Sequence, residues 1–410
     1  MDKFVANIEE IGYGGEGVCH NNGKVCFVKY SLPKEKLLVE KIEEKSKYDI
    51  GQIDTILEAS KDRTTPLCPY FGVCGGCDFQ HTNYKNELDI KKEILNKQLS
   101  RNGHNIDFSV VASDKDYFYR NKIRLFAGDK ALGLKKEKTN QCVEISSCKI
   151  VDQRINKILP ILNKFVYLQN LQFLINYIEI KTQNEKVLIN IFLKKKTTYD
   201  FSILQNITDC ELGLFETINN QTKHVFGLNN IFINENELNY IINPNSFRQI
   251  NSFIANIIYK KIIENVEIKT VVNCYSGAGV LSGMISLNGA KKVYGIELGE
   301  NEHNDAEKLK ENNNLINLIN LKGDCAKILP LYAKKADLVV IDPPRNGCDK
   351  KVCLTLNNSN IKKIIYISCN HATFVRDVKL LSKYRIKEIE LLDMFPKTAN
   401  FEIYSVLEKI

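Results

Sequence analysis

The sequence lacks two features that would direct a chain to or through a membrane. No apolar run approaches the roughly 20 residues that a membrane-spanning helix needs. The first residues, Met1 to Phe4, show no basic region followed by an apolar stretch, which is the pattern of a secretory signal. We therefore expect a cytoplasmic protein without membrane association. Disulfides are rare in that compartment, so the 13 cysteines are expected to be metal ligands, catalytic groups or buried thiols rather than crosslinks.

Length and charge set the next limits. A chain of 410 residues is too long for one compact core, so two or three domains are expected. Residues 1–60 contain 8 lysines and 11 acidic residues, whereas residues 61–240 contain 25 basic and 20 acidic residues. Residues 241–410 contain 24 basic and 18 acidic residues. The positive charge therefore lies in the last two segments, where it suits a polyanionic partner.

The first segment contains a glycine motif whose surroundings argue against a dinucleotide site. Gly12 to Gly17 matches G-x-G-x-x-G, which binds dinucleotides when a strand precedes it and a helix follows. Here Asn22-Gly23 lies between apolar runs, which indicates a β-hairpin instead of a helix. Residues 1–60 are therefore predicted to form a small β-barrel of the oligonucleotide-binding type. The net negative charge of this segment argues against strong phosphate contacts by it.

The second segment, residues 61–240, contains three closely spaced cysteines. Cys68, Cys74 and Cys77 follow the pattern C-x5-C-x2-C, with two glycines that relax the backbone between the last two. Such a thiolate group suits a soft metal centre, and a fourth ligand has to come from elsewhere: Cys148 is the first candidate and Cys142 the second. Four cysteines fit either an iron–sulfur cluster or structural zinc. The clustering makes unmetallated thiols the less favoured interpretation.

The remainder of this segment predicts an α+β domain. Leu88 to Leu99 repeats apolar residues at helical spacing, and residues 173–181 and 186–193 are predicted to be paired strands of an antiparallel sheet. Tyr117 to Arg124 interleaves aromatic and cationic residues. That pattern suits stacking on bases and neutralising phosphates, but an amphipathic strand with a solvated face explains it equally well.

The third segment, residues 241–410, alternates helices and strands as a Rossmann-like domain does. A predicted strand over 270–275 leads into Gly277-x-Gly279 and a helix over 280–287, and the next strand ends at Glu297. Glycines in the first turn allow a ligand close to the backbone, and an acidic side chain after the second strand can accept hydrogen bonds from both ribose hydroxyls. The third glycine of the fingerprint is missing. This departure favours S-adenosylmethionine over a dinucleotide, because no pyrophosphate has to be accommodated.

Two later strands end in reactive side chains. One ends at Asp342-Pro343-Pro344-Arg345, where amino-methyltransferases typically have an aromatic residue after the prolines, so an amine target is less attractive. The following strand ends at Cys369. Methylation of a pyrimidine at C5 needs a thiolate that adds to C6 and a base that removes the C5 proton. Cys369 and Glu402 are the predicted nucleophile and base, and the apolar strand around Glu402 should raise its pKa. The alternatives are a buried structural cysteine and a surface carboxylate.

These motifs resemble the bacterial RNA (uracil-5-)-methyltransferases, in particular the iron–sulfur-containing branch that acts on 23S ribosomal RNA. The resemblance covers the whole chain as a multidomain α/β protein: a TRAM-type barrel over 1–60, a central α+β domain with the cysteine cluster over 61–240 and a Rossmann-like methyltransferase domain over 241–410. It implies that S-adenosylmethionine methylates uridine to 5-methyluridine through a Cys369–C6 adduct, with Glu402 as the base. The implied [4Fe–4S] ligands are Cys68, Cys74, Cys77 and Cys148. The implied S-adenosylmethionine contacts are Gln249, Tyr275, Glu297, Asp342 and Asp324.

Three positions depart from the family pattern. Asn273 and Asn400 stand where the family usually has Asp and His, and His371 stands where it usually has Pro. None of these changes removes a group that the chemistry needs. Two other functions are alternatives: methylation of the T-loop uridine of tRNA, whose enzymes generally lack the cysteine cluster, and non-catalytic RNA binding by an iron–sulfur protein. The expected partner is 23S ribosomal RNA, and the expected state is a monomer.

Overall fold

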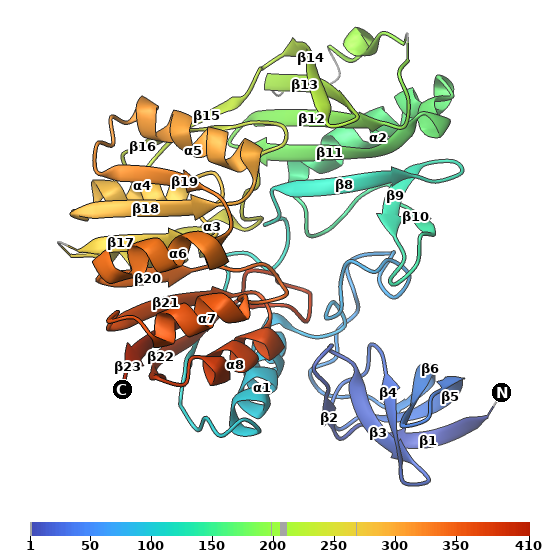
Figure 1. Cartoon of the computed structure of the whole chain (residues 1–410). Helices are drawn as coiled ribbons and strands as arrows, with labels where there is room; N and C mark the ends of the chain where they lie inside the picture. The colour runs from blue at the N-terminus through green and yellow to red at the C-terminus, as the bar shows by residue number, and fades with distance from the viewer. Residues whose placement is uncertain (1, 198, 206–210, 268) are drawn as a thin grey trace.

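The computed structural model describes residues 2–197, 199–205, 211–267 and 269–410, and Figure 1 shows the arrangement of its sheets. The N-terminal sheet has six strands in the hydrogen-bonded order β1-β5-β6-β4-β3-β2. Asn22 and Gly23 both have positive φ, 50° and 81°, at the turn between β3 and β4, so the predicted hairpin is confirmed. The strands are β1 (Lys3–Asn7), β2 (Glu10–Ile11), β3 (Gly17–Asn21), β4 (Lys24–Val28), β5 (Lys36–Glu44) and β6 (Tyr48–Glu58).

The predicted closed barrel is wrong. Among the described residues, the sheet begins at β1 and ends at β2, and no ladder of hydrogen bonds joins these two strands. Closure of a barrel requires every strand to pair on both sides, and β2 has only two residues. The chain then leaves the sheet in the glycine loop, where Gly12 N donates to Glu16 O at 2.7 Å. The strand β3 follows this loop, so the glycine motif does not open a helix.

The central sheet has seven strands in the order β10-β9-β8-β11-β12-β13-β14. The predicted antiparallel pair is confirmed as β11 with β12, whereas β12 and β13 are parallel. Alternate residues such as Ile178, Ile180 and Ile189 point into a core that α2 covers. The elements are β8 (Lys122–Ala127), β9 (Leu132–Lys135), β10 (Cys142–Glu144), α2 (Gln153–Leu168), η1 (Leu171–Phe173), β11 (Ile175–Gln183), β12 (Lys186–Leu193), η2 (Phe201–Leu204), β13 (Glu211–Ile218) and β14 (Gln221–Gly227).

The third large sheet has eight strands in the order β19-β18-β17-β20-β21-β23-β22-β7. The strands from β19 to β21 are parallel, and β23 runs antiparallel to β21. The predicted Rossmann-like alternation is therefore confirmed. The strands are β7 (Ser109–Val111), β17 (Thr270–Cys274), β18 (Lys292–Glu297), β19 (Leu318–Lys322), β20 (Leu338–Ile341), β21 (Lys363–Ser368), β22 (Tyr384–Leu392) and β23 (Glu402–Lys409).

Helices cover both faces of this sheet, as Figure 1 shows. One face packs against α1 (Tyr84–Ser100), α6 (Cys325–Tyr332), α7 (Lys350–Asn357) and α8 (His371–Leu380). The other packs against α3 (Ser252–Ile263), α4 (Val280–Leu287), α5 (Glu300–Asn312) and the hairpin of β15 (Ile231–Glu235) and β16 (Leu238–Ile242). A short helix, η3 (Ala333–Lys335), follows α6. Strands buried on both faces explain the continuous apolar runs in the sequence.

Two elements from the 61–240 segment belong spatially to this sheet. β7 pairs in parallel with β22 and completes its edge, with Val110 opposite Leu391. Helix α1 packs against α8. Contacts between residues far apart in sequence therefore join residues 84–111 to the C-terminal elements. In the described part of the chain, no helix is both long enough and apolar enough to cross a membrane.

Candidate active site

Three reactive side chains lie at one edge of the eight-stranded sheet. Asp342 directly follows β20, Cys369 directly follows β21, and Glu402 begins β23. β20 and β21 are parallel, whereas β21 pairs antiparallel with β23 and sets Ser368 opposite Ile403. The carboxyl ends of β20 and β21 therefore meet the amino end of β23. This register brings the predicted nucleophile and the predicted base together.

Burial raises the pKa of all three groups. Only 4% of the surface of Glu402 is exposed, and its Oε2 has no hydrogen-bond partner among the described residues. Burial, and then the neighbouring Asp342, raises the pKa of the Glu402 carboxyl well above its usual range. Burial raises the pKa of Asp342 to about 7. It also raises the pKa of the Cys369 thiol to about 11, and Glu402 and Asp342 add to that shift. A carboxyl with a raised pKa can accept a proton near neutrality.

Arg345 is a site residue that the sequence argument did not assign. Its positive charge lowers the pKa of Cys369 and of Glu402, against the larger effect of burial. Its carbonyl oxygen accepts hydrogen bonds from Asn370 Nδ2 (3.2 Å) and Thr373 Oγ1 (3.4 Å), so the proline turn is tied to the start of α8. The one signal in the sequence was its position directly after Pro343-Pro344, where amino-methyltransferases typically have an aromatic residue and this chain has an arginine.

A cavity beside the first glycine turn contains three of the predicted cofactor contacts. Gln249, Tyr275 and Asp342 line it, together with Asn273. Asn273 donates from Nδ2 to Ser282 Oγ at 2.9 Å, while its Oδ1 is buried and has no hydrogen-bond partner in the described structure. An unpaired buried acceptor is costly unless another group supplies a donor. The cavity therefore fits a ligand that carries hydrogen-bond donors.

Glu297 and Asp324 lie outside the lining of that cavity. The carboxylate of Glu297 accepts hydrogen bonds from Gly277 N (2.8 Å) and Gly299 N (2.7 Å), so it contacts the glycine turn that lines the cavity. Asp324 accepts a hydrogen bond from Ala326 N at 2.9 Å and caps α6. Glu297 thus contacts the glycine turn, whereas the hydrogen bond of the Asp324 side chain caps α6.

The four predicted cluster cysteines surround one small cavity. Cys68, Cys74, Cys77 and Cys148 all line it, whereas Cys142 does not. Burial raises the pKa of Cys74 to about 11 and also raises the pKa of Cys77 and Cys148. As the side chains stand, no group of three His, Cys, Asp or Glu residues within the described ranges is arranged to hold a metal ion. The donor set fits a thiolate-bound centre by its chemistry, and the cluster itself stays a prediction.

The N-terminal glycine loop reaches the same sheet edge. The ring of Tyr13 lies 5.5 Å from the ring of His371, and His371 stacks at 5.7 Å on Phe401, the residue before Glu402. At the position where the family usually has a proline, this chain therefore has the imidazole ring of His371, which lies between Tyr13 of the N-terminal region and Phe401 beside Glu402. Asn400, the other departure beside Glu402, is exposed.

The fold and the side chains at this sheet edge are those of an S-adenosylmethionine-dependent methyltransferase. A sequence model of the tRNA (uracil-5-)-methyltransferase family matches residues 83–410, and the chain belongs to that family. The prediction of an RNA uracil-5-methyltransferase is therefore confirmed at the level of the family. The iron–sulfur branch and the particular RNA stay predictions.

The similar proteins extend over nearly the whole chain. An uncharacterized RNA methyltransferase of Caldanaerobacter subterraneus subsp. tengcongensis is 32% identical over 440 residues, covering 98% of each chain. An uncharacterized RNA methyltransferase of Aquifex aeolicus is 30% identical over 419 residues, covering 98% of this chain and 97% of the relative. A solved structure, the Pyrococcus abyssi tRNA (uracil-54, C5)-methyltransferase in complex with S-adenosyl-L-homocysteine, has a TM-score of 0.84 and 27% identity and covers 98% of this chain and 99% of its own.

Proposed function

We propose that this chain methylates C5 of a uridine in RNA through a covalent adduct between Cys369 and C6 of the base. The observation that carries the proposal is the meeting of Cys369, Glu402 and Asp342 at neighbouring strand ends, beside the cavity that Asp342 lines. C5 of uracil is not nucleophilic enough to accept a methyl group unaided, and a thiolate on C6 gives it enolate character. The base has to be flipped out, because neither C5 nor C6 can be reached inside a stack.

The proposed reaction begins and ends with the Cys369 thiolate. Its Sγ bonds to C6, and the C5=C6 electron pair moves onto C5 and O4. C5 then takes the methyl group from the substrate S-adenosylmethionine, whose sulfonium–methyl bond breaks to leave S-adenosylhomocysteine. Glu402 removes the proton from C5. The electron pair of that C–H bond restores C5=C6, and the C6–S bond breaks to release the thiolate.

The surroundings of Glu402 support its role as the base. Burial holds the pKa of its carboxyl well above the usual range, so the group can hold the proton that it removes. The buried Oε2 atom has no hydrogen-bond partner in the described structure, so no protein group competes for the proton that it would accept. Cys369 is half-buried.

S-adenosylmethionine is proposed to bind in the cavity at the glycine turn. Gln249, Tyr275 and Asp342 line the cavity together with Asn273, whose buried Oδ1 has no hydrogen-bond partner in the described structure. Each carboxylate oxygen of Glu297 accepts one backbone hydrogen bond and keeps capacity for another, which suits the two ribose hydroxyls. Asp324, at the end of the next strand along the sheet, is the fifth proposed contact.

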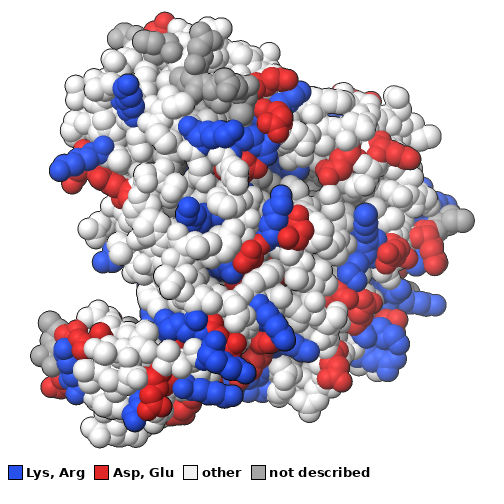
Figure 2. All heavy atoms as spheres, turned by 180° about the vertical axis from the view of Figure 1, so that it is seen from behind, with Lys and Arg blue, Asp and Glu red and all other residues white. Residues whose placement is uncertain are grey.

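The proposed substrate is 23S ribosomal RNA, and the cysteine-rich segment supports this choice because enzymes for the tRNA T-loop generally lack it. A tRNA uridine is the second candidate. It is favoured by the likeness to the Pyrococcus abyssi tRNA (uracil-54, C5)-methyltransferase, which covers 98% of this chain. Both candidates are polyanions. The face in Figure 2 has several Lys and Arg side chains where the small N-terminal region meets the rest of the molecule.

A [4Fe–4S] cluster is proposed to be held by Cys68, Cys74, Cys77 and Cys148. The shared cavity that these four thiols line supports the assignment. When bound, such a cluster supplies a rigid crosslink between residues 68–77 and the segment that contains Cys148. Gln80 supports the first ligand, because its Oε1 accepts a hydrogen bond from the Cys68 amide at 3.1 Å.

The test incubates the full chain with labelled S-adenosylmethionine and either ribosomal RNA or tRNA that lacks the modification. We expect the wild type to transfer methyl groups to ribosomal RNA, and Cys369→Ala to reduce transfer to background because no adduct can form. Glu402→Gln should give a protein–RNA adduct that survives a denaturing gel, because the C5 proton stays in place. Mass mapping of 5-methyluridine identifies the position.

Cys142→Ala is the matched control, since this cysteine lies outside both proposed sites. Undiminished transfer by Cys369→Ala would exclude the covalent mechanism. Free protein on the gel after incubation of Glu402→Gln would exclude Glu402 as the base. Methylated tRNA together with unmodified ribosomal RNA would select the second candidate.

A further inference from the structure

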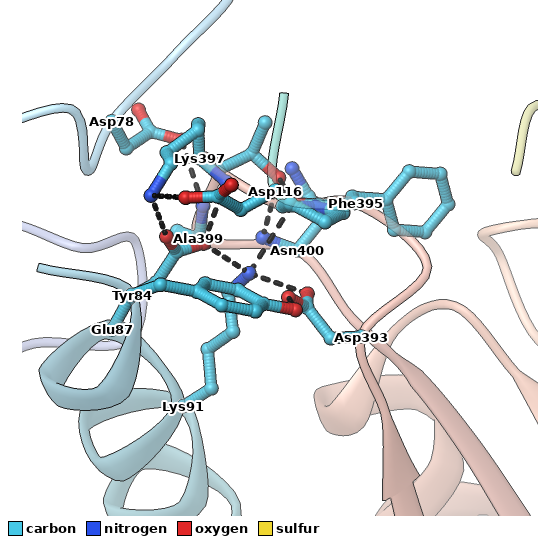
Figure 3. Close-up of polar contacts among 12 residues, drawn as sticks. Asp78, Tyr84, Glu87, Lys91, Asp116, Asp393, Phe395, Lys397, Ala399 and Asn400 are labelled. Carbon is cyan, nitrogen blue, oxygen red and sulfur yellow. Dashed lines mark hydrogen bonds and ion pairs between the residues drawn. The ribbon is translucent and has the colours of Figure 1, made fainter. Parts of the chain in front are cut away.

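A buried ion network holds the loop that delivers Glu402 (Figure 3). This loop, residues 393–401, connects β22 to β23 and sets where Glu402 enters the sheet. Lys91 of α1 donates hydrogen bonds to Asp393 Oδ1 (2.7 Å), Glu87 Oε1 (2.8 Å) and a loop carbonyl oxygen (3.2 Å). The side chains of Lys91, Glu87 and Asp393 are fully buried. One lysine thus joins the start of the loop to α1.

Lys397 extends the network to the turn in the middle of the loop. Its backbone N–H donates to Glu87 Oε1 at 2.6 Å, and its Nζ lies 3.2 Å from Glu87 Oε2 and 2.9 Å from Asp116 Oδ2. The Nζ also lies 5.1 Å and 4.9 Å from the ring centres of Tyr84 and Tyr117. Lys397 has a φ of +67°, a conformation that a lysine rarely adopts, so its surroundings have to hold it there.

The segment that follows Cys77 contacts the same turn. The amides of Asp78 and Phe79 both donate to the Lys397 carbonyl oxygen, at 2.8 Å and 3.1 Å. The Asp78 carboxylate accepts a hydrogen bond from the Ala399 amide at 2.9 Å (Figure 3). The cysteine-rich segment and α1, which are far from the loop in sequence, therefore both hold the backbone a few residues before Glu402.

A network of this kind suits positioning better than stabilisation. Desolvation of buried ions offsets most of their attraction, so such a network adds little net stability. It does fix one geometry, because each charged atom has a specific partner. The Oε2 atom of Glu402 has no hydrogen-bond partner among the described residues, so no such bond fixes this end of the side chain. The position of the Glu402 carboxyl therefore depends on the backbone that the network holds.

We propose that Lys91 and Lys397 are positioning residues that, together with Asp78, hold the 393–401 loop so that Glu402 reaches the C5 proton of the adduct. The inference rests on the proposed function and deepens it, because it assigns the network to one step. That step is proton removal. Cys369 follows β21, outside the loop that the network holds, so addition of the thiolate to C6 does not depend on these lysines.

The test measures adduct formation and adduct resolution separately, on an RNA that the full-length wild type methylates. Glu87→Gln combined with Lys397→Met removes one negative and one positive buried charge, which avoids an unpaired buried ion. Asp116→Asn is a milder variant, because 33% of the Asp116 side chain is exposed. Asp114 is exposed and lies two positions before Asp116. Asp114→Asn removes the same charge as Asp116→Asn and serves as the matched control.

We expect the double variant to form the adduct at the wild-type rate and to resolve it about 100-fold more slowly, since displacement of a reacting group by about 1 Å costs roughly that factor. The covalent band should therefore accumulate, as it does for Glu402→Gln. Asp116→Asn should slow resolution by a smaller factor, and Asp114→Asn should leave it unchanged. Thermal unfolding establishes that each variant is folded.

Equal slowing of both steps in a folded double variant overturns the inference, and so does an unchanged rate of resolution. If the double variant does not fold, Asp116→Asn decides the question: a resolution rate equal to that of Asp114→Asn overturns the inference. Failure of the proposed function has a different signature. In that case Glu402→Gln forms no adduct, whatever the network variants do.

Discussion

Arg345 is the charged side chain that opposes the raised pKa of Cys369. Burial raises the pKa of the thiol to about 11, and Arg345 opposes this shift. Below that pKa the thiolate fraction rises tenfold for each pH unit, so the rate of adduct formation should rise with pH across the neutral range. Arg345→Met removes the opposing charge, raises the pKa of Cys369 further and moves the profile to higher pH. We expect a rate roughly threefold to tenfold lower near neutral pH, measured in single-turnover reactions.

Arg345→Lys keeps the charge and is the control for this prediction. Its pH profile should stay close to that of the wild type, because an ammonium on a flexible stem can occupy the same exposed position. Superimposable profiles of the wild type and Arg345→Met would contradict the assigned role.

Single residues could be predicted where the chemistry is local in sequence. Cys369 and Glu402 were predicted because each lies where an apolar strand begins or ends, and the fold places them at neighbouring strand ends, while their catalytic roles stay a proposal. Lys91 and Lys397 were not predicted as site residues, because the sequence does not distinguish a buried lysine from a surface lysine. Their partners are known only from the fold. The spacing of Glu87 and Lys91, four residues apart on one helix, was the only local signal of their pairing.

Among the elements, the cysteine-rich segment gives the sharpest expectation. Cys148→Ser should lose most of the iron and acid-labile sulfide from anaerobically purified protein, because Cys148 lines the cavity with Cys68, Cys74 and Cys77. Cys142→Ser is the matched control and should retain both, since Cys142 does not line this cavity. Loss of the centre should also lower the thermal stability, because a metal centre that binds only the folded chain stabilises it.

Three outcomes would contradict this assignment of ligands. Equal iron content in the two variants would exclude Cys148 as a ligand. Loss of iron from Cys142→Ser alone would exchange the roles of the two cysteines. Zinc without labile sulfide in the wild type would replace the cluster by a single-ion site. Each outcome is read from metal and sulfide per chain and does not depend on methyl transfer.

Elements with strong local signals were predicted better than their closure into larger units. The Asn22-Gly23 hairpin and the alternation of β17, α4 and β18 follow from turn residues and apolar periodicity. The prediction of a barrel was wrong because closure depends on how far β2 extends. β2 ends after two residues, where the glycine loop turns toward His371. No local pattern in residues 1–60 indicates that the loop has a partner near His371.

At the scale of the whole molecule, residues 84–111 pack against the C-terminal part of the chain. β7 supplies the edge of the eight-stranded sheet, α1 packs on α8, and Lys91 pairs with Asp393. These contacts join residues about 280 to 300 positions apart, as the 302-residue separation of Lys91 and Asp393 illustrates. Sequence reasoning assigned α1 and β7 to the 61–240 segment, because periodicity carries no information on which sheet a short strand will join.

This packing predicts how fragments of the chain behave. A fragment of residues 83–410 retains α1 and β7 and should unfold cooperatively. A fragment of residues 112–410 lacks both, which uncovers the apolar face of α8, leaves β22 as an open edge and removes the partner of the buried Asp393. We expect this shorter fragment to bind a hydrophobic dye and to lose its cooperative thermal transition in circular dichroism. A cooperative transition in 112–410 within a few degrees of that of 83–410 would show that the C-terminal sheet is stable without α1 and β7. The contacts of Lys91 with Asp393 would then position the 393–401 loop without contributing to the stability of the sheet.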